Sequence, residues 1–142
     1  MMWYLSRMKT NFSSTGGINM KALSENEIIS TFTGYRVNAE SLSRCAHKNR
    51  EVHAEAEYII YSCGFLYDPA LREQFGVTGK MKDLWERRGT EFNVYVYVAD
   101  GVISSCHISK YRESDGARAS YNSLKCTQQE LRIAQRILSY IT

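Results

Sequence analysis

The chain has 142 residues, of which 44% are hydrophobic and 23% charged, and this composition excludes an intrinsically disordered protein. The net charge of +3 is too small to predict nucleic-acid binding by itself. No stretch approaches the roughly 18 apolar residues of a membrane span, so we expect a soluble, cytoplasmic protein. The four cysteines form no Cys-x-x-Cys pair and are expected to be reduced thiols.

The N-terminal part is predicted to lie outside the folded core. Residues 1–20 end in a Ser- and Gly-rich stretch, which favours a flexible lead or a short edge strand. We expect a single domain over residues 21–142. The capping box Ser24-Glu25-Asn26-Glu27 predicts that this domain begins with a short helix over residues 25–34.

A longer helical pattern follows this first helix. Asn38 can cap a helix from Ala39 to about Ser62, because apolar residues recur at helical spacing over this range. The polar run at residues 47–51 interrupts the apolar stripe and leaves open a turn between two shorter helices. One long helix is the interpretation that we adopt.

Two further helices are predicted from their end signals. Asp68-Pro69 combines a capping residue with a proline at the first helical position, so a short helix is expected to run to Phe75 and end at Gly76. The next helix begins near Lys80 and ends at Arg88. Its predicted buried residues are Met81, Leu84 and Trp85.

The clearest local pattern is a β-hairpin over residues 92–111. Asp100-Gly101 stands between two β-branched runs and predicts a two-residue type I′ turn, in which both central residues have positive φ. The turn places Ala99 opposite Val102. A regular ladder from this pair fixes which side chains share a face.

In that regular register, Glu91 lies opposite Lys110 and His107 lies opposite Val94. The face that carries Val94 is the predicted core face, so His107 is expected at the edge of the core. The opposite face of the first strand carries Asn93, Tyr95 and Tyr97.

The C-terminal part completes an α+β pattern. Residues 117–124 are predicted as a third antiparallel strand, and the capping box Thr127-Gln128-Gln129-Glu130 opens an amphipathic helix that reaches Ile141. The predicted fold is therefore α+β, with N-terminal helices (one of them long) packed on a small antiparallel β-meander and an amphipathic helix at the end.

No complete catalytic or metal site is predicted. His53-Ala54-Glu55 resembles the His-x-Glu element of zinc-dependent deaminases, but the Pro-Cys-x-x-Cys element of that family is absent. His53 and Glu57 could share one helix face, yet two ligands do not make a zinc site. Cys106 and His107 point to opposite faces of a strand. We therefore expect no cofactor and no metal, and a binding protein rather than an enzyme.

The predicted binding surface is the tyrosine-bearing face of the hairpin. Tyrosine and arginine are enriched at protein–protein hot spots, and we expect a protein partner, as for an inhibitor, adaptor or immunity-type factor. Sheet aromatics with nearby basic residues can also stack bases, so a nucleic acid or nucleotide is the alternative. Burial of the tyrosines under the last helix, and a homo-oligomer, are left open. The candidate binding residues are Tyr95, Tyr97, Arg118, Lys125 and Asn93.

Overall fold

A computed structural model describes residues 23–48, 58–113 and 121–142 of the chain. The predicted lead over residues 1–20, the His53-Ala54-Glu55 triplet and Arg118 lie outside the described residues. Within them, helices and one antiparallel sheet confirm the α+β class. Among the described residues, no helix has the length and apolar character needed to cross a membrane.

The sheet has five strands, and strands that follow each other in sequence are neighbours in space. Every neighbouring pair is antiparallel, which is the arrangement of a meander. The two long central strands form the predicted hairpin. The strands are β1 (His47–Lys48), β2 (Tyr58–Tyr61), β3 (Thr90–Ala99), β4 (Val102–Glu113) and β5 (Tyr121–Ser123).

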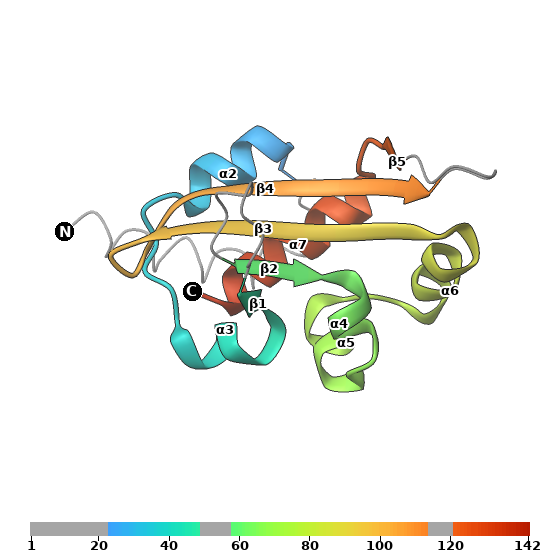
Figure 1. The fold of residues 1–142 in the computed structure, drawn as a ribbon, viewed down its shortest axis with the longest axis horizontal. Helices are drawn as coiled ribbons and strands as arrows, with labels where there is room; N and C mark the ends of the chain where they lie inside the picture. The colour runs from blue at the N-terminus through green and yellow to red at the C-terminus, as the bar shows by residue number, and fades with distance from the viewer. Residues whose placement is uncertain (1–22, 49–57, 114–120) are drawn as a thin grey trace.

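The helices lie around this sheet, with α7 behind it in the view of Figure 1 and α4, α5 and α6 at one end. The predicted end signals are present: capping boxes begin the first and last described helices, and Asp68 caps the helix that starts at Pro69. The helices are α2 (Glu25–Phe32), α3 (Ala39–Cys45), α4 (Ser62–Leu66), α5 (Pro69–Phe75), α6 (Gly79–Arg88) and α7 (Gln128–Tyr140).

The predicted long helix from Ala39 to Ser62 is wrong. Helix α3 ends at Cys45, and β1 and β2 occupy part of the remaining predicted range. The residues of β2 are β-branched or aromatic, which suits a strand, and the pairing Ile60↔Val94 buries Ile60 completely. Sheet pairing with β3 therefore outweighs the helical spacing of the apolar residues.

The predicted hairpin forms with the predicted turn, but the predicted register holds only for the two pairs next to the turn. Asp100 and Gly101 have φ values of 54° and 76°, as a type I′ turn requires. The pairs Ala99↔Val102 and Val98↔Ile103 keep the predicted register, and the register then shifts by one residue. Ser104 is the extra residue, and its hydroxyl donates a hydrogen bond of 3.1 Å to the carbonyl of Tyr97.

This β-bulge corrects two predicted pairs. Glu91 lies opposite Tyr111 rather than Lys110, and His107 lies opposite Tyr95 rather than Val94. A bulge places two residues of one strand against one residue of the other, so every later side chain changes its partner. His107 is consequently exposed on the tyrosine face and is not part of the core edge.

The core lies between the sheet and α7. Ile103 and Cys106 are both buried although their separation of three would place them on opposite faces of a regular strand, so the bulge is what allows both to face inward. The indole of Trp85 stacks on Phe92 with ring centroids 5.4 Å apart, which anchors α6 to the start of β3. The fully buried apolar residues of the central strand β3 and of α7 are Phe92, Val94, Val96, Ile133, Ala134, Ile137 and Leu138.

Candidate functional site

Tyr95 and Tyr97 lie on the face of the sheet opposite to Val94 and Val96. Helix α7 packs on the valine side, so it does not cover the two tyrosines, which are partly buried. The ring of Tyr95 stacks on His107 with centroids 5.8 Å apart, and 54% of the His107 side chain is exposed. These side chains form an aromatic patch on the face of the hairpin that points away from α7.

The other predicted binding residues do not join this patch as expected. Asn93 is fully buried, so its side chain is not presented to a ligand on the surface. Lys125 is exposed in the connection between β5 and α7. Arg118 lies outside the described residues. The sequence-predicted set is therefore reduced to Tyr95 and Tyr97 as a surface pair.

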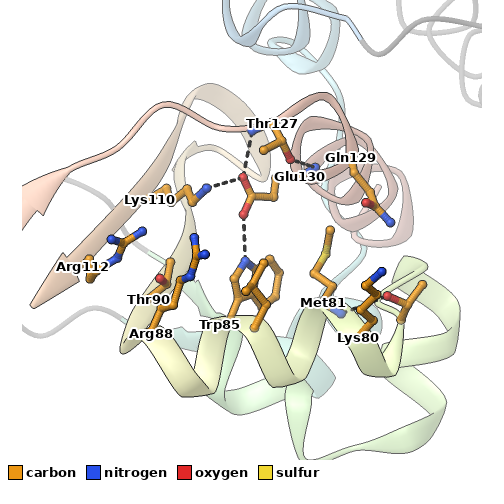
Figure 2. Close-up of a pocket in the computed structure, with 12 residues that line it drawn as sticks. Lys80, Met81, Trp85, Arg88, Thr90, Lys110, Arg112, Thr127, Gln129 and Glu130 are labelled. Carbon is orange, nitrogen blue, oxygen red and sulfur yellow. Dashed lines mark hydrogen bonds and ion pairs between the residues drawn. The ribbon is translucent and has the colours of Figure 1, made fainter.

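A different site, which the sequence reasoning missed, lies on the α7 side of the sheet. A pocket of about 540 Å³ is formed by α6, the start of β3, the end of β4 and the first turn of α7 (Figure 2). Lys110 and Arg112 point into it from β4. Both are on the face opposite to Tyr111, because alternate residues of a strand share a face. In the regular register they would have faced the side of Tyr95 and Tyr97.

The centre of the pocket holds a buried carboxylate. Glu130 is 3% exposed, and each of its oxygens accepts hydrogen bonds from inside the fold. The indole Nε1 of Trp85 donates to Oε2 at 2.8 Å, while Lys110 Nζ and the Thr127 amide donate to Oε1, each at 2.8 Å. Both oxygens of this carboxylate thus already accept hydrogen bonds from groups within the fold.

These contacts determine the charge of Glu130. Burial raises the pKa of this carboxyl, but the hydrogen bonds from Lys110, Thr127 and Trp85 outweigh burial and leave the pKa below its ordinary value of 4.5. Glu130 is therefore ionised at neutral pH and fixes the ammonium of Lys110 at the pocket wall. A fully paired, ionised carboxylate is a structural anchor and is not placed to act as a general base.

The charged side chains in the rest of the described pocket wall are cationic. Lys80 and Arg88 are exposed and Arg112 is partly buried. The Nε of Arg112 is shielded from solvent and has no hydrogen-bond partner among the described residues. Among the described residues that line the pocket, four side chains are cationic and Glu130 is the only carboxylate.

Two helix N-termini also face this pocket. Thr78 is the N-cap of α6 and accepts a hydrogen bond from the Met81 amide at 3.1 Å. Thr127 is the N-cap of α7 and accepts one from the Glu130 amide at 3.2 Å. Both threonines line the pocket. Helix N-termini carry partial positive charge, which adds to the charge of the lysines and arginines.

The described residues offer little for nucleophilic or metal chemistry. Burial and the nearby charge of Glu25 raise the pKa of Cys106 to about 11, so this thiol is protonated at neutral pH. No group of three or more His, Cys, Asp or Glu side chains in the described ranges is arranged to hold a metal ion. The four cationic side chains that line the pocket give it the charge suited to an anion.

Comparisons with protein-family models, with curated proteins and with solved structures find no match for this chain.

Proposed function

We propose that the protein is a non-catalytic binding protein and that the pocket between α6, β4 and α7 holds an anionic group of its ligand. The observation that carries the proposal is the charge of the pocket wall, where Lys80, Arg88, Lys110 and Arg112 surround one carboxylate that is already engaged. Such an excess of positive charge in a partly enclosed space favours a negative partner.

The two arginines supply the directional part of this recognition. A guanidinium presents N–H groups in a planar fork that matches the oxygens of a phosphate or a carboxylate. Arg112 and Arg88 both line the pocket, and each can present such a fork to an anion that enters it.

Titration calorimetry with inorganic phosphate at constant ionic strength tests the proposal. We expect binding by the wild-type protein and loss of binding in the double variant Arg88→Gln/Arg112→Gln. Arg87→Gln is the matched control, because Arg87 is the exposed neighbour on the same helix and does not line the pocket. Equal binding by all three proteins would overturn the proposal.

A protein partner at the aromatic patch is the second candidate function. The stack of Tyr95 on the exposed His107 supports it, because partly exposed aromatic side chains are typical of protein–protein hot spots. The test is quantitative capture of a partner from the source cell by wild-type protein and by Tyr95→Ala and Tyr97→Ala. Tyr67→Ala is the control, since Tyr67 is 77% exposed elsewhere on the surface. A partner that all the variants retain equally contradicts this candidate.

A further inference from the structure

We infer that the ligand of this pocket is a small molecule with two phosphate groups, one bound at each end of α6. The inference rests on the proposed function and specifies its ligand class. It follows from the positions of the cationic side chains along the pocket, which are divided between two ends rather than gathered at one point.

One end of the pocket lies at the C-terminal end of α6. Arg88 is the last residue of α6, and Thr90 at the start of β3 pairs with Arg112 of β4, so these three residues are neighbours. Figure 2 shows Arg88, Thr90 and Arg112 together on one side of Trp85. Two guanidinium groups and a hydroxyl at one place are suited to a phosphate group.

The other end lies at the N-terminal end of α6. Lys80 is in the first turn of this helix, and in Figure 2 it lies with Met81 and Gln129 on the opposite side of Trp85 from Arg112. The Met81 and Glu130 amides in the first turns of α6 and α7 are engaged by the cap residues, so these helix N-termini contribute partial positive charge at this end. The ammonium of Lys80 therefore acts together with two helix N-termini.

The separation of the two ends sets the size of the ligand. Lys80 and Arg88 are eight residues apart on one helix, which corresponds to about 12 Å along the axis at 1.5 Å per residue. In the structure the two side chains also lie on opposite sides of Trp85 (Figure 2), so one phosphate group would not contact both without a rearrangement of these side chains. The pocket volume of about 540 Å³ falls within the range of small-molecule sites. The partly buried Leu84 adds apolar wall between the ends for the body of such a molecule.

A polynucleotide is less well matched to these observations. Single-strand binding proteins combine a basic groove with exposed aromatic platforms for the bases. Among the described residues that line this pocket, the aromatic one is Trp85, which is 2% exposed and has its indole N–H engaged by Glu130. Tyr95 and Tyr97 lie on the other face of the sheet from Lys110 and Arg112. We therefore assign the site to a small bisphosphorylated molecule.

The test compares a nucleoside 3′,5′-bisphosphate, the matching 5′-monophosphate and inorganic phosphate by titration calorimetry. We expect the bisphosphate to bind on the order of tenfold more tightly than the monophosphate. This gain in affinity corresponds to one additional charge-assisted hydrogen bond, made by the second phosphate. Lys80→Gln is expected to remove this gain while leaving affinity for the monophosphate unchanged, because the two arginines hold the first phosphate. Arg87→Gln is the control and should retain the gain.

The outcomes separate this inference from the proposed function. Equal affinity for the bisphosphate and the monophosphate overturns the two-phosphate ligand but leaves anion binding in place. Tighter binding of a single-stranded oligonucleotide than of the bisphosphate, with a steep salt dependence, assigns the site to nucleic acid instead. Absence of binding by every phosphate compound, inorganic phosphate included, overturns the proposed function itself.

Discussion

The indole N–H of Trp85 donates a hydrogen bond of 2.8 Å to Oε2 of Glu130 and joins α6 to α7 across 45 positions of the chain. The second oxygen of Glu130 accepts from Lys110 of β4, so one carboxylate connects two helices and the sheet. The same residue closes the capping box of α7. A single buried carboxylate thus fixes three elements and one wall of the pocket.

Glu130→Gln is expected to lower the free energy of unfolding by about 2–4 kcal/mol, because it leaves the ammonium of Lys110 partly buried without its counter-charge. Urea denaturation at pH 7 measures the change. Glu86→Gln is the control, since its ion pair with Lys82 is partly exposed on α6, and a change within about 0.5 kcal/mol is expected there. Similar losses in the two variants would contradict the role assigned to Glu130.

The pH dependence of stability follows from the lowered pKa of Glu130. In the unfolded chain this carboxyl titrates near 4.5, and in the folded chain it titrates at lower pH. Its ionisation therefore stabilises the fold fully above about pH 4.5, and this contribution is lost as the pH falls through the folded pKa. The stability gap between wild type and Glu130→Gln should narrow between pH 5 and pH 2 in a series of urea titrations. If the difference in free energy of unfolding between the two proteins stays constant over this range, it does not come from the ionisation of Glu130.

Deletion of Ser104 tests the bulge. Removing the extra residue converts β4 to a regular strand while Ile103, Cys106 and Lys110 keep their faces, so the fold should persist. Deletion of Ser109 is the matched control, because it moves Lys110 to the opposite face and breaks the contact with Glu130. Near-UV circular dichroism and urea denaturation should show a much larger loss for the Ser109 deletion. A larger loss for the Ser104 deletion would contradict a bulge at Ser104.

Tyr97→Ala is expected to change the free energy of unfolding by no more than about 1 kcal/mol, because this side chain lies outside the core. Ile108→Ala is the comparison and should cost about 2–5 kcal/mol, since Ile108 is buried beside Val94. Thermal or urea denaturation gives both values. A loss for Tyr97→Ala as large as that for Ile108→Ala would show that Tyr97 belongs to the core.

Native-state thiol labelling tests the burial of the cysteines. Burial raises the pKa of Cys45 to about 12, and burial with the charge of Glu25 raises that of Cys106 to about 11. Iodoacetamide at pH 8 should therefore label both slowly in the folded protein and rapidly in urea. Mass spectrometry of the peptides resolves each site. Equal rates at Cys106 with and without urea would contradict its place in the core.

Gly76→Ala is expected to destabilise the protein by about 1–2 kcal/mol, because Gly76 ends α5 with a φ of 75° and a Cβ there would meet the guanidinium of Arg136. Gly79→Ala is the matched control. The Cβ that this substitution adds has open space at the start of α6. Unfolding measurements should therefore find the Gly79→Ala variant as stable as the wild-type protein or slightly more stable. Two variants of equal stability would contradict the left-handed conformation of Gly76.

Local chemistry in the sequence determined much of the fold. Capping boxes at Ser24 and Thr127, the Asp68-Pro69 helix start and the Asp100-Gly101 turn all act between residues close in the chain, and each is present in the structure. The tyrosine pair on one face of β3 also follows from the two-residue period of a strand. These features could be predicted because their energies depend on neighbours in the sequence.

Tertiary structure alone decided the register and the candidate site. The sequence pattern of Tyr58–Tyr61 suits a helix or a strand, and only pairing with β3 selects the strand. The bulge at Ser104 lets Ile103 and Cys106 both reach the core, and it thereby turns Lys110 and Arg112 to the α7 side. There Lys110 meets a carboxylate 20 residues away, and Trp85 reaches the same group from 45 residues away. Non-local packing of this kind leaves no local signature, which is why the sequence by itself determined the hairpin and its turn but not the pocket behind it.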